Sequence, residues 1–201
     1  MTEEKEPRLL HLSWSDIQRL TEELAESVKK SGFKPDLIVA VSRGGFDPAR
    51  ILCDQLGIRR LASVQIEYYT GVDQKCGSPQ VVYPLNSDVP GLKVLVVDDV
   101  SDTGSSLRTA MEHVADRGAS EVRVATLHVK PWTTFRPDYY AAEVDAWIVY
   151  PWEPVESMIS MAGRLEKRGL TRPRIKRRLI DLGFDRELVE RLLKNPNRLR
   201  L

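Results

Sequence analysis

The chain has 201 residues, which is enough for one α/β domain with an appendage and too few for two full catalytic domains. Hydrophobic residues make up 42% and charged residues 29%, and no apolar run reaches the ~18 to 20 residues of a membrane helix. The first residues lack the basic-then-apolar order of a signal peptide, so we expect a cytoplasmic protein without a membrane partner. Cys53 and Cys76 are far apart and in no metal-ligand spacing, which fits a reducing compartment.

The net charge of +1 is unevenly distributed along the chain. Residues 171–201 hold ten Lys or Arg against four Asp or Glu, so the preceding 170 residues are net acidic. We therefore expect two regions of different character: a domain over residues 1–154 and a basic helical extension over residues 155–201.

An amphipathic helix is predicted first, beginning at Ser13, which can cap it, and ending at Gly32. Its apolar residues recur at helical spacing, at Ile17, Leu20, Leu24 and Val28. A short apolar run, Asp36–Val41, follows and is typical of a strand buried on both faces of a sheet.

The next predicted helix has Asp47 at its cap and Pro48 at its first position, and it ends at Gly57. A strand is expected over Leu61–Tyr69, and the polar residues 70–86 read as a long functional loop.

A second buried strand, Lys93–Asp98, leads into a loop and a helix from about Gly104 to Gly118. Further strands are expected over Glu121–Val129 and Ala146–Tyr150, before helices after Pro154 that include a hairpin over residues 174–194. This alternation predicts an α/β fold, a mostly parallel twisted sheet flanked by helices. Ligands in such sheets bind at the carboxyl ends of the strands.

The segment Val94–Ser106, VLVVDDVSDTGSS, carries the most specific chemistry. Carboxylates such as Asp98 and Asp99 at a strand end accept hydrogen bonds from vicinal hydroxyls and favour a nearby Mg²⁺. Gly104–Ser106 open a helix, whose N-terminal N–H groups and positive dipole end bind phosphate, and Thr103 adds a hydroxyl. Taken singly, each of these residues is better explained as a helix cap or as a solvated strand end, but the whole run together suits a sugar phosphate.

This run resembles the 5-phosphoribosyl-1-diphosphate signature of the type I phosphoribosyltransferases. The resemblance implies the fold of that family, with Mg²⁺ as cofactor and with Asp98 and Asp99 holding the ribose hydroxyls. It further implies a cradle for the 5-phosphate formed by Asp102, Thr103, Gly104, Ser105 and Ser106. In 6-oxopurine members the acid at the place of Asp102 lies near N7 of the base, so Asp102 is the expected general acid/base.

The SRGG turn that follows the first buried strand is, by itself, equally compatible with an ordinary turn bearing a surface arginine and with a phosphate-binding loop. Glycines permit close backbone approach to a ligand, and a guanidinium can bind phosphate in a bidentate manner. The turn resembles the family's pyrophosphate loop, in which a cis peptide often precedes the residue at the place of Arg43. The substrate-binding residues expected here are Ser42, Arg43, Gly44 and Gly45.

Ile66–Pro79 occupies the place of the family's flexible loop, which closes over the reacting centre and excludes water. Related 6-oxopurine enzymes have a Ser-Tyr pair there, and this chain has Tyr68 and Tyr69. Tyr69 matches the aromatic residue and is expected to act at the reacting centre, whereas Tyr68 stands where the serine would be. Lys75 is either a pyrophosphate contact or a solvated loop lysine.

The segments KPW, PDYY and WIVYPWE resemble xanthine-guanine and hypoxanthine phosphoribosyltransferases and archaeal-type purine enzymes. Alone, Lys130 is better explained as a snorkelling lysine and Trp147 as a core tryptophan. The resemblance implies that Lys130 reads O6, that Trp147 stacks on the base and that the Ile148 backbone faces the purine 2-position. It also implies that Glu153 joins Asp98 and Asp99 as a metal ligand.

The sequence therefore predicts transfer of the 5-phosphoribosyl group from 5-phosphoribosyl-1-diphosphate to hypoxanthine, guanine or xanthine by a homo-oligomer. The alternative is a regulator that senses the same diphosphate and binds nucleic acid through the basic residues 172–178. A third possibility, a helical adaptor, rests on residues 179–193, which resemble ubiquitin-associated-type helices. The complete base-reading segment favours catalysis, so we expect no nucleic-acid partner.

Overall fold

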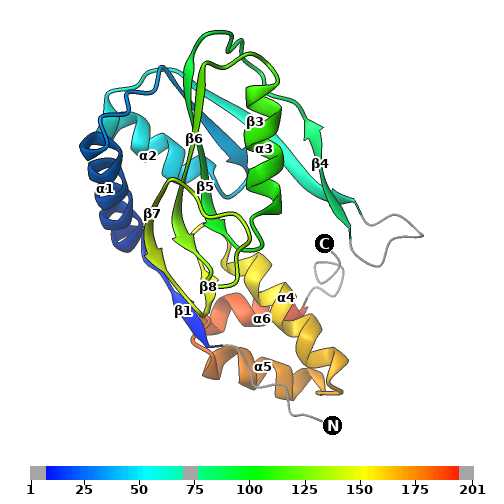
Figure 1. The fold of residues 1–201 in the computed structure, drawn as a ribbon. Coiled ribbons are helices and arrows are strands. Elements are labelled where there is room, and N and C mark those ends of the chain that lie inside the picture. The colour runs from blue at the N-terminus through cyan, green and yellow to red at the C-terminus, as the bar shows by residue number, and fades with distance from the viewer. Residues whose placement is uncertain (1–7, 70–76, 195–201) are drawn as a thin grey trace. The chain divides into compact units, whose positions relative to one another are not determined.

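The computed structural model describes residues 8–69 and 77–194, and its chain divides into two compact units (Figure 1). The larger unit is Ser15–Asp145, and the smaller unit combines the described residues on either side of it. The division predicted from the sequence, 1–154 and 155–201, stays a prediction. None of the helices within the described ranges combines the length and apolar content that a membrane span needs.

The larger unit is built on a six-stranded sheet in the order β4-β3-β2-β5-β6-β7. All neighbouring strands are parallel except β3 and β4, which confirms the predicted, mostly parallel α/β sheet. The strands are β2 (Leu37–Ser42), β3 (Leu61–Tyr69), β4 (Ser78–Tyr83), β5 (Lys93–Ser101), β6 (Glu121–Val129) and β7 (Tyr139–Glu143).

The direction of the crossovers fixes where a ligand can bind in this sheet. The chain passes from β2 through α2 (Phe46–Leu56) to β3, and from β5 through α3 (Ser105–Ala115) to β6. Because these connections run in opposite directions from the central strands, right-handed crossovers place α2 and α3 on opposite faces of the sheet. The crevice outside the carboxyl ends of β2 and β5 is therefore the switch point of the sheet, where open α/β folds bind ligands.

Strands β2 and β5 contain continuous apolar runs because both of their faces are buried in the core. Leu37, Val39 and Val41 of β2 pack in one cluster with Leu107 and Val114 of α3. The alternate residues of the same strands are also buried, because a helix covers each face. The amphipathic helix predicted after Ser13 is confirmed as α1 (Trp14–Lys30), with its predicted apolar residues buried.

Several predicted boundaries were wrong. Helix α2 begins at Phe46 with Gly45 as its N-cap, so Asp47 and Pro48 lie within its first turn and do not cap it. Strand β5 continues three residues beyond the predicted end at Asp98.

Two edge strands were not predicted. The predicted loop over residues 70–86 contains β4, an edge strand whose mostly exposed residues show no buried face. β7 was missed, because it is a short edge strand that follows an irregular stretch.

In the smaller unit, β1 (Leu9–His11) pairs in parallel with β8 (Trp147–Val149). The predicted C-terminal helices are present as α4 (Pro154–Lys167), α5 (Arg172–Asp181) and α6 (Arg186–Lys194). They share a hydrophobic core that includes Met158, Leu165, Ile175, Leu179, Phe184 and Val189. The break between α4 and α5 falls at Gly169, whose φ is +81°, and not at Pro173, which lies in the first turn of α5.

Replacing Leu37 by alanine tests the core without touching the carboxyl edge of the sheet, because Leu37 opens β2. We expect a loss of about 2–5 kcal/mol in the free energy of unfolding, as is typical of a buried leucine. Leu61→Ala is the matched control, since Leu61 is 40% exposed and should cost clearly less. Urea unfolding of both variants measures the difference, and equal losses would contradict the packing described.

Candidate active site

Two loops meet at the switch point of the sheet. β2 and β5 are paired in parallel, so the residues after Ser42 and around Asp99 emerge at the same edge. A Cβ added to Gly44 would lie only 2.2 Å from Asp99 Oδ2, which shows that the SRGG turn contacts the acidic pair. A glycine is needed here for packing against Asp99, and the predicted approach of this backbone to a ligand stays a prediction.

The turn is anchored at its other glycine. A Cβ on Gly45 would lie 2.3 Å from the carbonyl oxygen of Val97 and 2.7 Å from that of Val41. The Gly45 N–H also donates a hydrogen bond of 2.9 Å to the Val41 carbonyl oxygen. The Ser42–Arg43 peptide bond is cis, as the family resemblance implies.

Hydroxyl groups converge at the start of α3, after Gly104 with its φ of +85°. The Oγ atoms of Thr103 and Ser105 are 2.8 Å apart, and Tyr68 Oη lies 3.1 Å from the first and 2.5 Å from the second. Burial raises the pKa of Tyr68, but hydrogen bonds from Ser105, Thr103 and Ser106 outweigh it and leave the pKa below its usual value. This cluster surrounds the helix N-terminus where an anion is favoured.

A cavity of about 350 Å³ brings most of the predicted donor-binding residues together. Its lining residues are Tyr68, Asp98, Asp99, Val100, Asp102, Thr103, Gly104, Ser106 and Leu107. The carboxylates and the hydroxyls thus line one space, as a sugar phosphate would require.

A second segment, Lys130–Phe135, runs along this loop and is hydrogen-bonded to it. The Lys130 N–H donates to the Ser101 carbonyl oxygen at 3.0 Å, and the Thr134 N–H and hydroxyl donate to the Thr103 carbonyl oxygen at 3.1 and 2.9 Å. The predicted base-reading lysine and the predicted phosphate loop therefore belong to one hydrogen-bonded unit.

Lys130 is nearly buried, with 7% of its surface exposed. Burial lowers the pKa of Lys130, while the nearby charges of Asp102 and Asp145 act in the opposite direction. Burial and the charge of Lys130 lower the pKa of His128 to about 4, so this imidazole is neutral at pH 7. The arrangement makes Lys130 a poorly hydrated hydrogen-bond donor beside Asp102.

The remaining predicted base-site residues lie in the smaller unit. Trp147 and Ile148 belong to β8, and Glu153 is the N-cap residue of α4. The guanidinium of Arg164 lies 4.6 Å from the centre of the Trp147 ring, so one face of the indole is covered within this unit. The predicted site residues therefore fall into two groups, one in each unit.

Two predictions fall at the edge of the described chain. Tyr69 is the last residue of β3, and its side chain lies outside the described residues, as does Lys75. Within residues 8–69 and 77–194, no three or more His, Cys, Asp or Glu side chains are grouped in a way that could hold a metal ion. The metal roles of Asp98, Asp99 and Glu153 therefore stay predictions.

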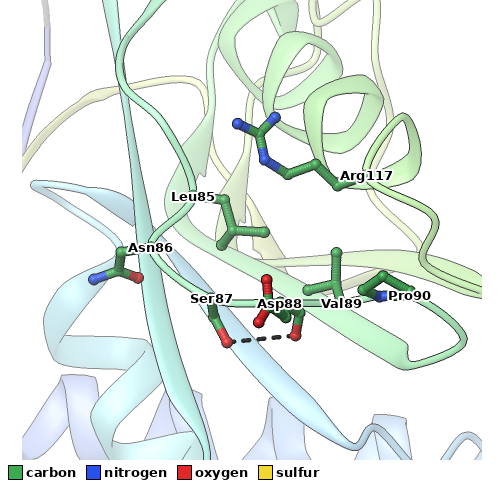
Figure 2. A pocket seen from close by; sticks show the side chains of 7 residues that line it. All are labelled: Leu85, Asn86, Ser87, Asp88, Val89, Pro90 and Arg117. Atoms are coloured by element: carbon green, nitrogen blue, oxygen red, sulfur yellow. Dashed lines mark hydrogen bonds between the residues drawn. The ribbon is translucent and has the colours of Figure 1, made fainter.

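The larger unit has a second hollow, of about 320 Å³, shown in Figure 2. Residues 85–90, which precede β5, line it together with Arg117, which follows α3. β5 starts at this end and α3 finishes here, so the hollow lies opposite the edge that carries Asp99. The predicted catalytic and substrate-binding residues are not among its lining.

Sequence reasoning missed two contacts of this site. It assigned no role to Trp132, whose indole Nε1–H donates a hydrogen bond of 2.7 Å to Asp102 Oδ1. It also did not predict that the Tyr68 hydroxyl contacts Thr103 and Ser105. Trp132 belongs to the KPW motif, but the motif does not indicate that this tryptophan contacts a residue 30 positions earlier in the chain.

Fold and site together define a phosphoribosyltransferase, and residues 12–156 match the phosphoribosyl transferase domain family, to which the chain belongs. The chain is 31% identical to a xanthine-guanine phosphoribosyltransferase of Gluconobacter oxydans, over 76% of this chain and 91% of that protein.

Solved structures show the same likeness. A purine phosphoribosyltransferase of Pyrococcus horikoshii is 38% identical with a TM-score of 0.66, over 73% of this chain and 94% of the other. A hypothetical protein from Neisseria gonorrhoeae, solved with bound ppGpp, is 29% identical with a TM-score of 0.67, over 74% and 90%. Helices α5 and α6 lie beyond the residues that match the family.

The two neighbouring glycines of the SRGG turn should respond differently to alanine. Gly45→Ala drives a Cβ into two backbone carbonyls, so we expect a loss of several kcal/mol in the free energy of unfolding, on the order of ~3. Gly44→Ala meets a carboxylate side chain that can rotate, so it should cost less stability and displace Asp99. Chemical unfolding of the pair measures this, and an equal or reversed order would contradict the geometry.

Proposed function

We propose that the chain transfers the 5-phosphoribosyl group of 5-phosphoribosyl-1-diphosphate to a 6-oxopurine and so makes a nucleoside monophosphate. The observation that carries this proposal is that one loop holds the acidic pair, Asp102 and the hydroxyl cradle, and is hydrogen-bonded to the segment of Lys130. Relatives named as xanthine-guanine and purine phosphoribosyltransferases support the same activity.

The donor is assigned to the larger unit. Asp98 and Asp99 would accept hydrogen bonds from the two ribose hydroxyls, and residues 102–106 would hold the 5-phosphate at the start of α3. The backbone of Gly44 and Gly45 and the guanidinium of Arg43 would face the diphosphate. Tyr69, at the end of β3, is assigned to the reacting centre.

The larger unit offers two carboxylates as ligands for a magnesium ion. Two adjacent carboxylates, Asp98 and Asp99, line the cavity, and Mg²⁺ is commonly held by one or two carboxylates together with substrate phosphates. With only these two carboxylates assigned to it in the larger unit, the ion would take its other ligands from the diphosphate and water. The bound ion would neutralise charge on the leaving group, and Glu153 is assigned as a further ligand.

In the reaction, the purine nitrogen N9 attacks C1 of the ribose, the bond from C1 to the diphosphate oxygen breaks, and diphosphate leaves. The base must lose one proton, and Asp102 is assigned to take it at N7. Lys130 donates a hydrogen bond to O6, which holds the ring in place as negative charge spreads over it. Trp147 would stack on the base, and the Ile148 backbone would face the 2-position.

Lys130 also restricts the base. An ammonium group can only donate hydrogen bonds, so it suits the carbonyl of hypoxanthine, guanine or xanthine and opposes the 6-amino group of adenine. These three bases differ only at the 2-position, where the assigned contact is a backbone group. A homo-oligomer is proposed from the family resemblance alone.

The test mixes the purified chain with the ribosyl diphosphate, Mg²⁺ and each of the four bases, and measures nucleoside monophosphate and diphosphate. Products should form in equal amounts with at least one 6-oxopurine, and adenine should be the poorest acceptor. Absence of nucleotide with all four bases, from protein that is folded by circular dichroism, would overturn the proposed function.

Removing the carboxylate at position 102 should affect turnover selectively. Asp102→Asn keeps the size of the side chain but cannot accept the proton, so kcat should fall by about 10²- to 10⁴-fold. Affinity for the ribosyl diphosphate should stay within about twofold, well below the tenfold change that corresponds to about 1.4 kcal/mol. The control is Asp116→Asn, since Asp116 is exposed at the end of α3. Equal loss of turnover and donor binding would sink the general-base assignment.

The hydroxyl of Tyr68 should compete with the donor phosphate. It hydrogen-bonds to Thr103 and Ser105, two groups assigned to the phosphate, so binding must displace it. Tyr68→Phe should therefore bind the ribosyl diphosphate about threefold more tightly, the size of one modest net hydrogen bond. Calorimetry measures this, with the exposed Tyr83→Phe as control. Weaker binding would instead make the Tyr68 hydroxyl part of the phosphate site.

A further inference from the structure

Trp132 occupies an unusual place for a tryptophan. It is 53% exposed, so the hydrophobic effect explains little of its position. Its indole Nε1–H donates a hydrogen bond of 2.7 Å to Asp102 Oδ1, and its ring centre lies 5.5 Å from Lys130 Nζ. A single exposed side chain therefore contacts both polar groups assigned to the purine.

The backbone on either side of Trp132 is held in place. Before it, the Lys130 N–H donates to the Ser101 carbonyl oxygen, and after it, Thr134 donates twice to the carbonyl oxygen of Thr103. The carbonyl oxygen of Phe135 accepts a hydrogen bond of 2.8 Å from the Ser101 hydroxyl. The indole is thus presented to Asp102 from a segment anchored to the loop on which Asp102 lies.

The hydrogen bond has a directional consequence for Asp102. Oδ1 accepts the hydrogen bond from the indole N–H, which restrains rotation of the carboxylate, and in the proposed mechanism Oδ2 would take the proton from the base. A hydrogen bond to a charged acceptor is stronger than one between neutral groups, so it restrains a side chain on a solvent-facing loop. The electron-rich face of the same ring attracts the Lys130 ammonium, which restrains the second group.

We infer that Trp132 is a positioning residue, which orients Asp102 for proton transfer and holds Lys130 beside it. The inference rests on the proposed function, because the roles of Asp102 and Lys130 come from it. Trp132 does not touch the reacting atoms in this scheme and acts through Asp102.

The test is Trp132→Phe, which keeps an aromatic face for Lys130 and removes the N–H. We expect kcat to fall by about tenfold or more, since a hydrogen bond to a charged group is lost, with the KM of the ribosyl diphosphate within about twofold of wild type. The matched control is Trp14→Phe, because Trp14 is 55% exposed and belongs to the smaller unit. An unchanged kcat in Trp132→Phe, or an equal loss in the control, overturns the inference.

A double variant separates positioning from a general structural effect. If Trp132 acts through the carboxylate, adding Trp132→Phe to Asp102→Asn should lower kcat by less than about twofold further. Effects that multiply in the double variant would mean that the tryptophan acts independently of Asp102, against the inference.

The failure of the inference can be distinguished from that of the proposed function. A folded wild-type protein that makes no nucleotide overturns the function and the assigned roles with it. An active wild-type protein with an unaffected Trp132→Phe variant overturns only the role of Trp132. The nuclear magnetic resonance signal of the indole N–H gives an independent reading: it should shift in Asp102→Asn and stay in place in Asp116→Asn, and the reverse contradicts the contact.

Discussion

The approach of the SRGG turn to the end of β5 is the constraint on which the site depends. No side chain larger than hydrogen fits at Gly44 without moving Asp99, and none fits at Gly45 without moving backbone. The contact is possible because β2 and β5 are parallel neighbours whose following helices depart to opposite faces, which leaves the crevice between their ends open. Close backbone packing thus brings the SRGG turn next to a pair of carboxylates, the juxtaposition on which the proposed sugar diphosphate site depends.

The second organising contact joins the phosphate loop to the segment Lys130–Phe135. It depends on another glycine, because a Cβ at Gly104 would lie 2.5 Å from the Cβ of Phe135. Hydrogen bonds from Lys130 and Thr134 to carbonyl oxygens of Ser101 and Thr103 continue the contact along the loop. The segment that carries Lys130 and the loop assigned to the donor phosphate are therefore held together within the larger unit. A two-substrate reaction requires such a connection, since both reactants must be held in one geometry.

Sequence patterns predicted two kinds of feature: strands that are buried on both faces of the sheet, and motifs whose residues are contiguous in the chain. β2 and the first half of β5 are apolar runs because both faces of these strands are covered, and the acidic and hydroxyl residues of Val94–Ser106 are contiguous in the sequence. Edge strands such as β4 left no pattern, since pairing on one side and exposure to solvent suit polar residues as well as apolar ones. The contacts of Trp132 and Tyr68 join residues 30 or more positions apart, and residue spacing does not encode which hydroxyl or carboxylate lies opposite.

Asp102 and Lys130 are best understood as one electrostatic pair. Burial lowers the pKa of Lys130, and the Asp102 charge opposes that effect, so the carboxylate helps keep a nearly buried amine protonated. A neutral side chain at position 102 would remove a proton acceptor and also weaken this support of the ammonium. In the proposed mechanism, the lost proton acceptor would affect proton removal at N7 of every purine, whereas the weakened ammonium would affect only a base whose carbonyl faces Lys130. Loss of Asp102 should therefore cost a 6-oxopurine more than a base that makes no hydrogen bond to the lysine, and under the proposed mechanism discrimination between bases would depend on the same carboxylate as proton transfer.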